Sequence, residues 1–388
     1  MLWEKKATLR PMPEATTLEE IASLARSHDA VNLAQGFPDT PGPADIRASA
    51  AAALIDGPNQ YPPVRGMPEL RSAVAAHYGE HQNFVLSPDQ VLITSGGTEA
   101  LAASILALVA PGDDVLVIEP MYDAYAPLVQ RAGAAVRPVR LSPPCWRLDE
   151  TALRKAMTPA TRVLLLSQPA NPMSRVFDDE ERSILARFCV EHDLIVISDE
   201  VWEHILFDGA VHRSLASYPG MSARTVKLGS AGKILSLTGW KVGFVCAEAF
   251  LLDQVARMHQ CLTFSTPPNL QTAVAYGLRR PKSEFIEERM RLAASRERLA
   301  RQLSESGFAV LPSQATYFLY VDLPESGIRL NDAAFCRLAI VEAGVATIPV
   351  SLLYSASPLR TLIRICFART DAVLDEGTKR LAVARGLV

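Results

Sequence analysis

The spacing of hydrophobic residues changes along this chain, and the change predicts two kinds of structure. Between residues 91 and 247, short continuous apolar runs alternate with helical stretches, as in an α/β fold whose strands are buried on both faces. The seven runs expected to form strands are 91–94, 114–119, 134–140, 162–167, 194–198, 225–228 and 242–247. Ligands of such sheets gather beyond the carboxyl ends of the strands.

Beyond residue 280 the pattern becomes that of a smaller α+β domain. Pro281 opens a long charged helix that carries Leu292, Leu299 and Leu303 on one face. The further elements expected are a strand at 315–321, a helix at 332–343, a strand at 362–367 and a terminal helix.

The first part of the chain is rich in proline and irregular, apart from a helix expected at 18–27. A second helix is expected at 45–56, ended by Gly57, and a third should open at Pro68 and close at Gly79. The predicted domains are an N-terminal arm (1–44) that contributes to the small domain, a large domain (45–285) and a small C-terminal domain (286–388).

Composition narrows the functional classes. The 388 residues exceed what one core usually serves, and 21% charged with 49% apolar residues is typical of a globular protein. A net charge of −3 gives no argument for a nucleic acid or membrane partner. The six cysteines are scattered, so we expect reduced core residues and no metal site. With no signal-like N-terminus and no long apolar segment, a cytoplasmic protein is expected.

Glycines and polar residues follow several of the expected strands. Ser95-Gly-Gly-Thr98 after the first run could present amides to a phosphate, or could form a simple tight turn. Tyr122 after the second run could stack on a flat ring or pack in the core. Asn171 follows the fourth run, and Asp199 ends the very apolar fifth, where a carboxylate needs a cationic partner unless it caps a helix.

Lys233 lies in a segment, 229–243, that we expect to be too rich in glycine and serine for a packed helix. Ser230 precedes it by three positions and Lys241 follows it by eight. A lysine amine forms Schiff bases with carbonyl compounds, including the aldehyde of pyridoxal phosphate (PLP). The hypothesis is that Lys233 holds PLP while Ser230 and Lys241 hold its phosphate; the alternative for a lone lysine is a solvated surface residue.

Taken in order with Arg364, these motifs resemble the fold type I PLP aminotransferases over essentially the whole chain. The resemblance is closest to the methionine, glutamine and kynurenine aminotransferase group. The stretches that carry this finer match are 32–39, Asn59-Gln-Tyr61 and 238–243. The resemblance implies the PLP-transferase fold, with a mostly parallel seven-stranded sheet in the large domain and a smaller α+β domain.

The resemblance also implies a task for each matching residue. Lys233 would bind the cofactor covalently and move the substrate proton, and Asp199 would keep the ring nitrogen protonated. Asn171 would bind the phenolic oxygen and Tyr122 would stack on the ring. The phosphate ligands would be Gly97, Thr98, Ser230 and Lys241, with Tyr61 reaching in from the neighbouring subunit.

On the substrate side, Arg364 would clamp the α-carboxylate, assisted by Asn171 and the backbone of Gly36. Without the resemblance, simpler roles are open: Arg364 could form a salt bridge on the strand surface, Gly36 could form a turn, and Tyr61 could form a packing contact. In dicarboxylate-specific relatives the partner subunit brings an additional arginine to the site. The loop expected at that place, 261–268, lacks an arginine, and its Phe264 indicates an apolar wall. Neutral amino donors are therefore expected.

The chain departs from the family pattern at two positions. Trp202 stands where the family often has a tyrosine that donates to the phenolic oxygen, so the indole either donates a poorer bond or simply packs. Ser167 stands where a helper asparagine is usual.

The function expected is a homodimeric PLP-dependent aminotransferase, with its active site at the subunit interface, that moves the amino group of a neutral amino acid to a 2-oxo acid. A cysteine-conjugate β-lyase on the same scaffold is the alternative. A non-catalytic PLP-fold binding protein is a weaker alternative. Such regulators carry an additional DNA-binding domain, and 388 residues are expected to leave no room for one.

Overall fold

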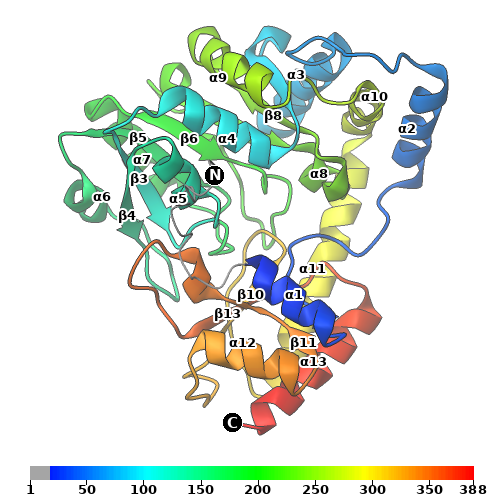
Figure 1. Cartoon of the computed structure of the whole chain (residues 1–388), viewed down its shortest axis with the longest axis vertical. Coiled ribbons are helices and arrows are strands. Elements are labelled where there is room, and N and C mark those ends of the chain that lie inside the picture. The colour runs from blue at the N-terminus through cyan, green and yellow to red at the C-terminus, as the bar shows by residue number, and fades with distance from the viewer. Residues whose placement is uncertain (1–17) are drawn as a thin grey trace, which may run out of the picture.

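The computed structural model describes residues 18–388, and a seven-stranded sheet forms the centre of their larger part (Figure 1). Its order is β2-β8-β7-β6-β5-β3-β4, and β8 pairs antiparallel with both β2 and β7 while the remaining pairs are parallel. The strands are β2 (Val91–Thr94), β3 (Asp114–Glu119), β4 (Ala135–Arg140), β5 (Thr161–Ser167), β6 (Ile195–Asp199), β7 (Thr225–Ser230) and β8 (Gly243–Cys246). The seven expected strands and the mostly parallel α/β architecture are confirmed.

Helices cover both faces of this sheet because all of its strands except the edge strand β4 are apolar on both sides. Side chains of one face, such as Val117 and Leu165, pack against helices α4, α5 and α9. Those of the opposite face, such as Leu164 and Leu166, pack against α7. The helices that flank the sheet are α4 (Gly97–Leu108), α5 (Tyr125–Arg131), α6 (Glu150–Ala156), α7 (Asp179–Glu191) and α9 (Ala249–Leu262).

A third group of helices packs beside strands β2 and β8 through its own apolar cluster. These helices are α2 (Ala44–Asp56), α3 (Pro68–Gln82), α8 (Ala231–Ile234) and α10 (Pro268–Leu278). The expected end of α3 at Gly79 is wrong. The helix continues to Gln82, and Asn83 ends it in the left-handed conformation with φ 51°.

The smaller part is built on a four-stranded antiparallel sheet of order β12-β13-β10-β9. The long α11 descends from the larger part into the smaller one (Figure 1), with Leu292, Leu299 and Leu303 buried as expected. The elements here are β9 (Ala309–Leu311), β10 (Phe318–Asp322), β12 (Ile348–Pro349), β13 (Leu362–Cys366), α11 (Lys282–Glu305), α12 (Asp332–Val341) and α13 (Asp371–Gly386).

The N-terminal segment joins this smaller part. Strand β1 (Val31–Asn32) pairs in parallel with β11 (Val345–Ala346), and α1 (Leu18–Ser27) packs against the same region. The domain boundaries remain predictions, and residues 1–17 of the arm lie outside the described part of the chain.

Strand β10 begins later than expected. Ala315 forms an isolated bridge with Leu206, and Thr316 has φ 70°, so the extended pairing starts at Phe318 instead of residue 315. Four of the six free cysteines are buried, as expected of core residues, whereas Cys145 and Cys261 are exposed, which corrects the expectation for these two. Within the described residues, no helix is both long and apolar enough to cross a membrane.

Candidate active site

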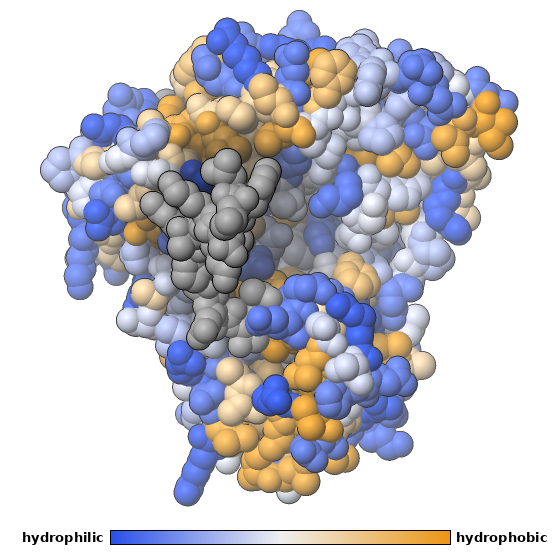
Figure 2. All heavy atoms as spheres, in the orientation of Figure 1, coloured by the Kyte–Doolittle hydropathy of each residue, from blue (hydrophilic) through white to orange (hydrophobic). Residues whose placement is uncertain are grey.

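A cavity of about 370 Å³ opens at the carboxyl ends of β6 and β7, where the larger part faces β10 and β13. Figure 2 shows the molecule hollowed between its upper and lower parts on one face. The predicted site residues that line this cavity are Gly36, Gly97, Thr98, Tyr122, Asn171, Asp199, Trp202, Ser230, Lys233, Lys241 and Arg364. Segments more than three hundred residues apart in sequence thus meet here.

Lys233 is held by a short helix, which corrects the expectation of an unpacked loop. After β7 the chain enters α8, and the Ser230 hydroxyl caps this helix by accepting a hydrogen bond from the Lys233 amide at 3.4 Å. The Lys233 Nζ donates to the Gly36 carbonyl at 2.7 Å and lies 4.4 Å from the centre of the Trp202 ring. Burial lowers the pKa of Lys233 to about 8, which makes a neutral, nucleophilic amine accessible.

Asp199 sits at the carboxyl end of β6, where it is 9% exposed. Its Oδ2 accepts a hydrogen bond from Tyr125 Oη at 2.8 Å, and its Oδ1 accepts one from the Val201 amide at 3.3 Å. Burial raises the pKa of Asp199 to about 6 in spite of these donors. The sequence reading missed Tyr125, although its place three residues after Tyr122 at the start of a helix would put both rings near one another.

The start of α4 forms a cradle for an anion. Gly96 precedes the helix with φ 83° and provides no side-chain cap for it, which leaves the first-turn amides uncapped within the described part of the chain. A Cβ on Gly97 would lie 3.0 Å from Val201, and one on Gly96 would lie 3.3 Å from Lys241 Cε. A phosphate would fit here, because free amides, the Ser230 hydroxyl and the Lys241 ammonium surround the closely packed pair Gly96 and Gly97.

Arg364 enters the cavity from β13 and is 5% exposed. Its Nη1 donates to Asn171 Oδ1 at 3.3 Å, and its guanidinium lies 3.9 Å from the centre of the Phe318 ring. Its Nε has no hydrogen-bond partner among the described residues. Asp123 acts on this guanidinium electrostatically, but no carboxylate of the described residues forms an ion pair with it. A buried guanidinium with an unused donor calls for an anionic ligand. No sequence signal marked Phe318, which reaches the site through the pairing of β10 with β13.

Trp202 lines the cavity and packs against two aromatic rings. It is 4% exposed, and its ring packs edge-on against Tyr317 and Phe318 at centroid distances of 5.0 and 5.6 Å. Whether its N–H donates to a cofactor stays a prediction.

Two predicted site residues lie outside this cavity. Tyr61 and Phe264 are 82% and 40% exposed, and their ring centroids are 5.1 Å apart. Both were expected to act on a neighbouring subunit, so their position outside their own chain's cavity does not conflict with that expectation.

The residues of the cavity fit pyridoxal phosphate. The cofactor offers an aldehyde for the Lys233 amine, a phosphate for the first turn of α4, and a basic ring nitrogen for Asp199. Asp199 carries a pKa raised by burial, as expected of a carboxylate that awaits a cation. Arg364 remains free to bind the carboxylate of a substrate.

Comparison with known proteins agrees with this chemistry. Residues 28–381 match the family model of aminotransferase class I and II. The chain is 41% identical to the probable N-succinyldiaminopimelate aminotransferase DapC of Mycobacterium tuberculosis, covering 96% of this chain and 97% of the relative. The solved structure of that enzyme superposes with a TM-score of 0.92, covering the same shares of the two chains.

Two further relatives are named for other amino acids. Methionine aminotransferase of Escherichia coli is 36% identical, covering 96% of each chain. Human kynurenine–oxoglutarate transaminase 1 is 35% identical, covering 93% of this chain and 94% of the relative. Because all three are named for transamination, the β-lyase alternative is not favoured. The chain belongs to the class I and II aminotransferases, PLP-dependent enzymes that transfer an amino group between amino acids and 2-oxo acids.

Proposed function

We propose that this aminotransferase takes its amino group from an amino acid with a neutral side chain, and that the cavity residues act as follows. One observation supports these roles above all: Lys233, Asp199 and Arg364 line the same cavity at the carboxyl ends of the strands. The bound cofactor supplies an aldehyde that condenses with amines and a ring that accepts the electron pair left at the substrate Cα.

Lys233 is the residue that would hold the cofactor covalently and then carry the substrate proton on Nζ. Its pKa of about 8 lies close to physiological pH, so the protonated and neutral forms are both accessible and the amine can take up and return a proton. The Gly36 carbonyl, which accepts from Nζ at 2.7 Å, steadies the amine within the cavity.

Asp199 is the counter-ion that would keep the ring nitrogen protonated, and Tyr125 is the donor that keeps Asp199 ionised. Asn171 would bind the phenolic oxygen, and Tyr122 would stack on the ring. The residues proposed to hold the phosphate are Gly97, Thr98, Ser230 and Lys241.

Arg364 would bind the substrate carboxylate, with Asn171 and the Gly36 backbone beside it. The described residues that line the cavity include three cations, Lys233, Lys241 and Arg364, and each already has one of these roles. The rest of the lining includes apolar Phe37 and Ile348. A charged distal carboxylate would find no unassigned cation among these residues, which favours a neutral donor.

The relatives support the same range of substrates and add a second candidate. Two are named for methionine and kynurenine, whose side chains carry no carboxylate. The relative at 41% identity is named for N-succinyldiaminopimelate, whose far end carries carboxylates. That identity makes the succinylated compound the second candidate donor for this chain.

A donor screen with the purified enzyme decides between them. Methionine, glutamine, kynurenine, aspartate and N-succinyldiaminopimelate are each tested with several 2-oxo acids, and kcat/KM is compared. We expect a neutral donor to exceed aspartate by more than about tenfold, since an unpaired buried carboxylate costs about 1.4 kcal/mol or more. Preferred turnover of N-succinyldiaminopimelate would instead establish the second candidate.

We also propose that the enzyme works as a homodimer in which Tyr61 and Phe264 complete the partner subunit's cavity. Their exposure and mutual contact on the surface support this arrangement. Coexpression of Lys233→Ala with Tyr61→Ala chains tests it, because each mixed dimer would contain one intact site and the mixture would regain about a quarter of wild-type activity. Activity no higher than that of the two variants measured separately would contradict it. The cytoplasmic location stays a prediction.

A further inference from the structure

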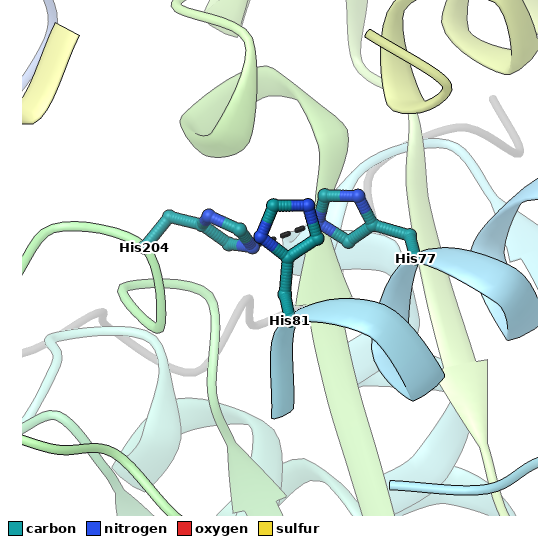
Figure 3. Close-up of side chains that lie close together, drawn as sticks. All are labelled: His77, His81 and His204. Carbon is teal, nitrogen blue, oxygen red and sulfur yellow. Dashed lines mark hydrogen bonds between the residues drawn. The ribbon is translucent and has the colours of Figure 1, made fainter. Parts of the chain in front are cut away.

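Three of the seven histidines of the chain lie close together in the larger part (Figure 3), and none of them is among the described residues that line the cavity. His77 and His81 lie one turn apart on α3, and His204 reaches them from the segment that follows β6. Figure 3 shows the three rings converging, with His81 between the other two in this view. One nitrogen from each ring lies within 4.8 Å of the other two.

His77 is oriented as metal-binding histidines commonly are. Its Nδ1 lies 3.2 Å from the Leu278 carbonyl at the end of α10, and a carbonyl only accepts, so Nδ1 carries the proton. The lone pair of His77 therefore sits on Nε2, which faces His204 Nε2 at 2.8 Å. In the structure His204 must donate its own proton into this lone pair.

The surroundings keep the rings neutral. Burial lowers the pKa of His77 to about 3 and also lowers the pKa values of His81 and His204. Phe285 covers all three rings, at centroid distances of 5.0 to 5.5 Å. The charged side chains that act on the group are Glu80, Glu203, Lys227, Lys282 and Arg289. Neutral imidazoles with free lone pairs are the form that binds metal ions.

A second cluster of possible metal ligands, which contains two glutamates, is less suited to bind a metal ion. Glu200, Glu203 and His212 also present ligand atoms close together, with every residue buried. Lys227 already neutralises this group, because its Nζ donates to Glu200 at 2.6 Å and also to Glu203. Among the described residues no lysine or arginine donates a hydrogen bond to the three histidines; Lys227 acts on His77 and His204 through its charge alone.

We propose that His77, His81 and His204 bind a zinc ion through their ring nitrogens, with water in the remaining position. Nitrogens bound tetrahedrally at about 2.0–2.1 Å from zinc stand roughly 3.4 Å apart, so the close pair must open slightly and the half-buried His81 must turn inward. His204 frees its Nε2 by carrying its proton on Nδ1 instead. Imidazole ligands also suit the neighbouring first-row dications, such as cobalt.

Such an ion would join α3 to a segment that also lines the active site. His204 comes two residues after Trp202, whose ring faces Lys233. Zinc would tie this segment to α3 and hold Trp202 in its place, while touching neither cofactor nor substrate. The expected effect is a higher melting temperature of the holoenzyme with little change in kcat.

The test is metal binding to untagged, chelator-treated holoenzyme, measured by calorimetry with zinc and by visible absorption with cobalt. We expect one equivalent per chain, weakened at least about 100-fold in His81→Asn, because one ligand of three is lost. His28→Asn, an exposed histidine on α1's C-terminal side, is the matched control and should bind as the wild type does.

Absence of saturable binding to the wild type, or unchanged affinity in His81→Asn, would overturn the proposal. Cofactor absorbance and melting temperature without metal establish that the variant is folded. Should His81→Asn fail to fold, X-ray absorption of the zinc-loaded wild type decides, since a shell without three imidazole nitrogens would contradict the site.

Discussion

Removing the hydroxyl of Tyr125 should make cofactor binding depend on pH in a way that the wild type does not. Tyr125 is 1% exposed and donates to Asp199 at 2.8 Å, so Tyr125→Phe leaves the ring in place and removes one donor from a buried carboxylate. A hydrogen bond to a charged group is worth about 1.5–3 kcal/mol, or about one to two pKa units. The pKa of Asp199 should therefore rise from about 6 to roughly 7–8.

The sign of the effect follows from which form binds the cofactor. A cationic ring nitrogen requires ionised Asp199, so protonation of this carboxyl weakens binding. Near pH 7 the variant should lose roughly two- to tenfold in affinity, and the loss should shrink towards pH 8.5, where the carboxyl is again ionised. In the empty protein, the raised pKa of Asp199 favours the fold at low pH, and this contribution is lost as pH rises through about 6.

The assay is a spectrophotometric titration of PLP in the Lys233→Ala background, where binding is reversible, from pH 6 to 8.5. Tyr276→Phe is the matched control, because Tyr276 also donates to an aspartate, Asp45 at 3.2 Å, but is 48% exposed. A loss of affinity that is constant across this pH range, or equal in the control, would refute the link between Tyr125 and the ionisation of Asp199.

Three further predictions concern the cavity. Lys233→Ala should abolish covalent cofactor attachment and nearly all transamination; borohydride reduction and peptide mapping of the wild type should tag Lys233, and a tag on Lys227 or Lys241 would disprove the assignment. Arg364→Lys should lower kcat/KM for the amino donor about 10- to 100-fold, because the two-pronged contact to a carboxylate is lost, and steady-state kinetics with the cofactor content held equal would measure it. Trp202→Tyr should lower the pH midpoint of the cofactor's absorbance change, because a hydroxyl stabilises the ionised phenolic oxygen; coincident titration curves would leave Trp202 as a packing residue only.

Local patterns were enough to predict the central sheet. Six of its seven strands are buried on both faces and consist largely of continuous apolar runs, whereas the edge strand β4 is mostly exposed; the polar residues that follow the strands mark the ligand edge. The errors came where one residue's local preference was outweighed by its surroundings. Gly79 does not end α3, and the serine- and glycine-rich stretch around Lys233 forms a helical turn because Ser230 caps it and its neighbours pack inside.

The parts of the site that escaped prediction depend on tertiary contacts. Tyr125 matters only because α5 lies against the end of β6, and Phe318 only because β10 pairs with β13 in a register that sets its ring beneath Arg364. Neither residue belongs to a motif, and each acts through a residue that does. Family motifs therefore identify the residues that we propose to bind cofactor and substrate, whereas the side chains that set the charge and position of those residues become visible only when the fold brings them together.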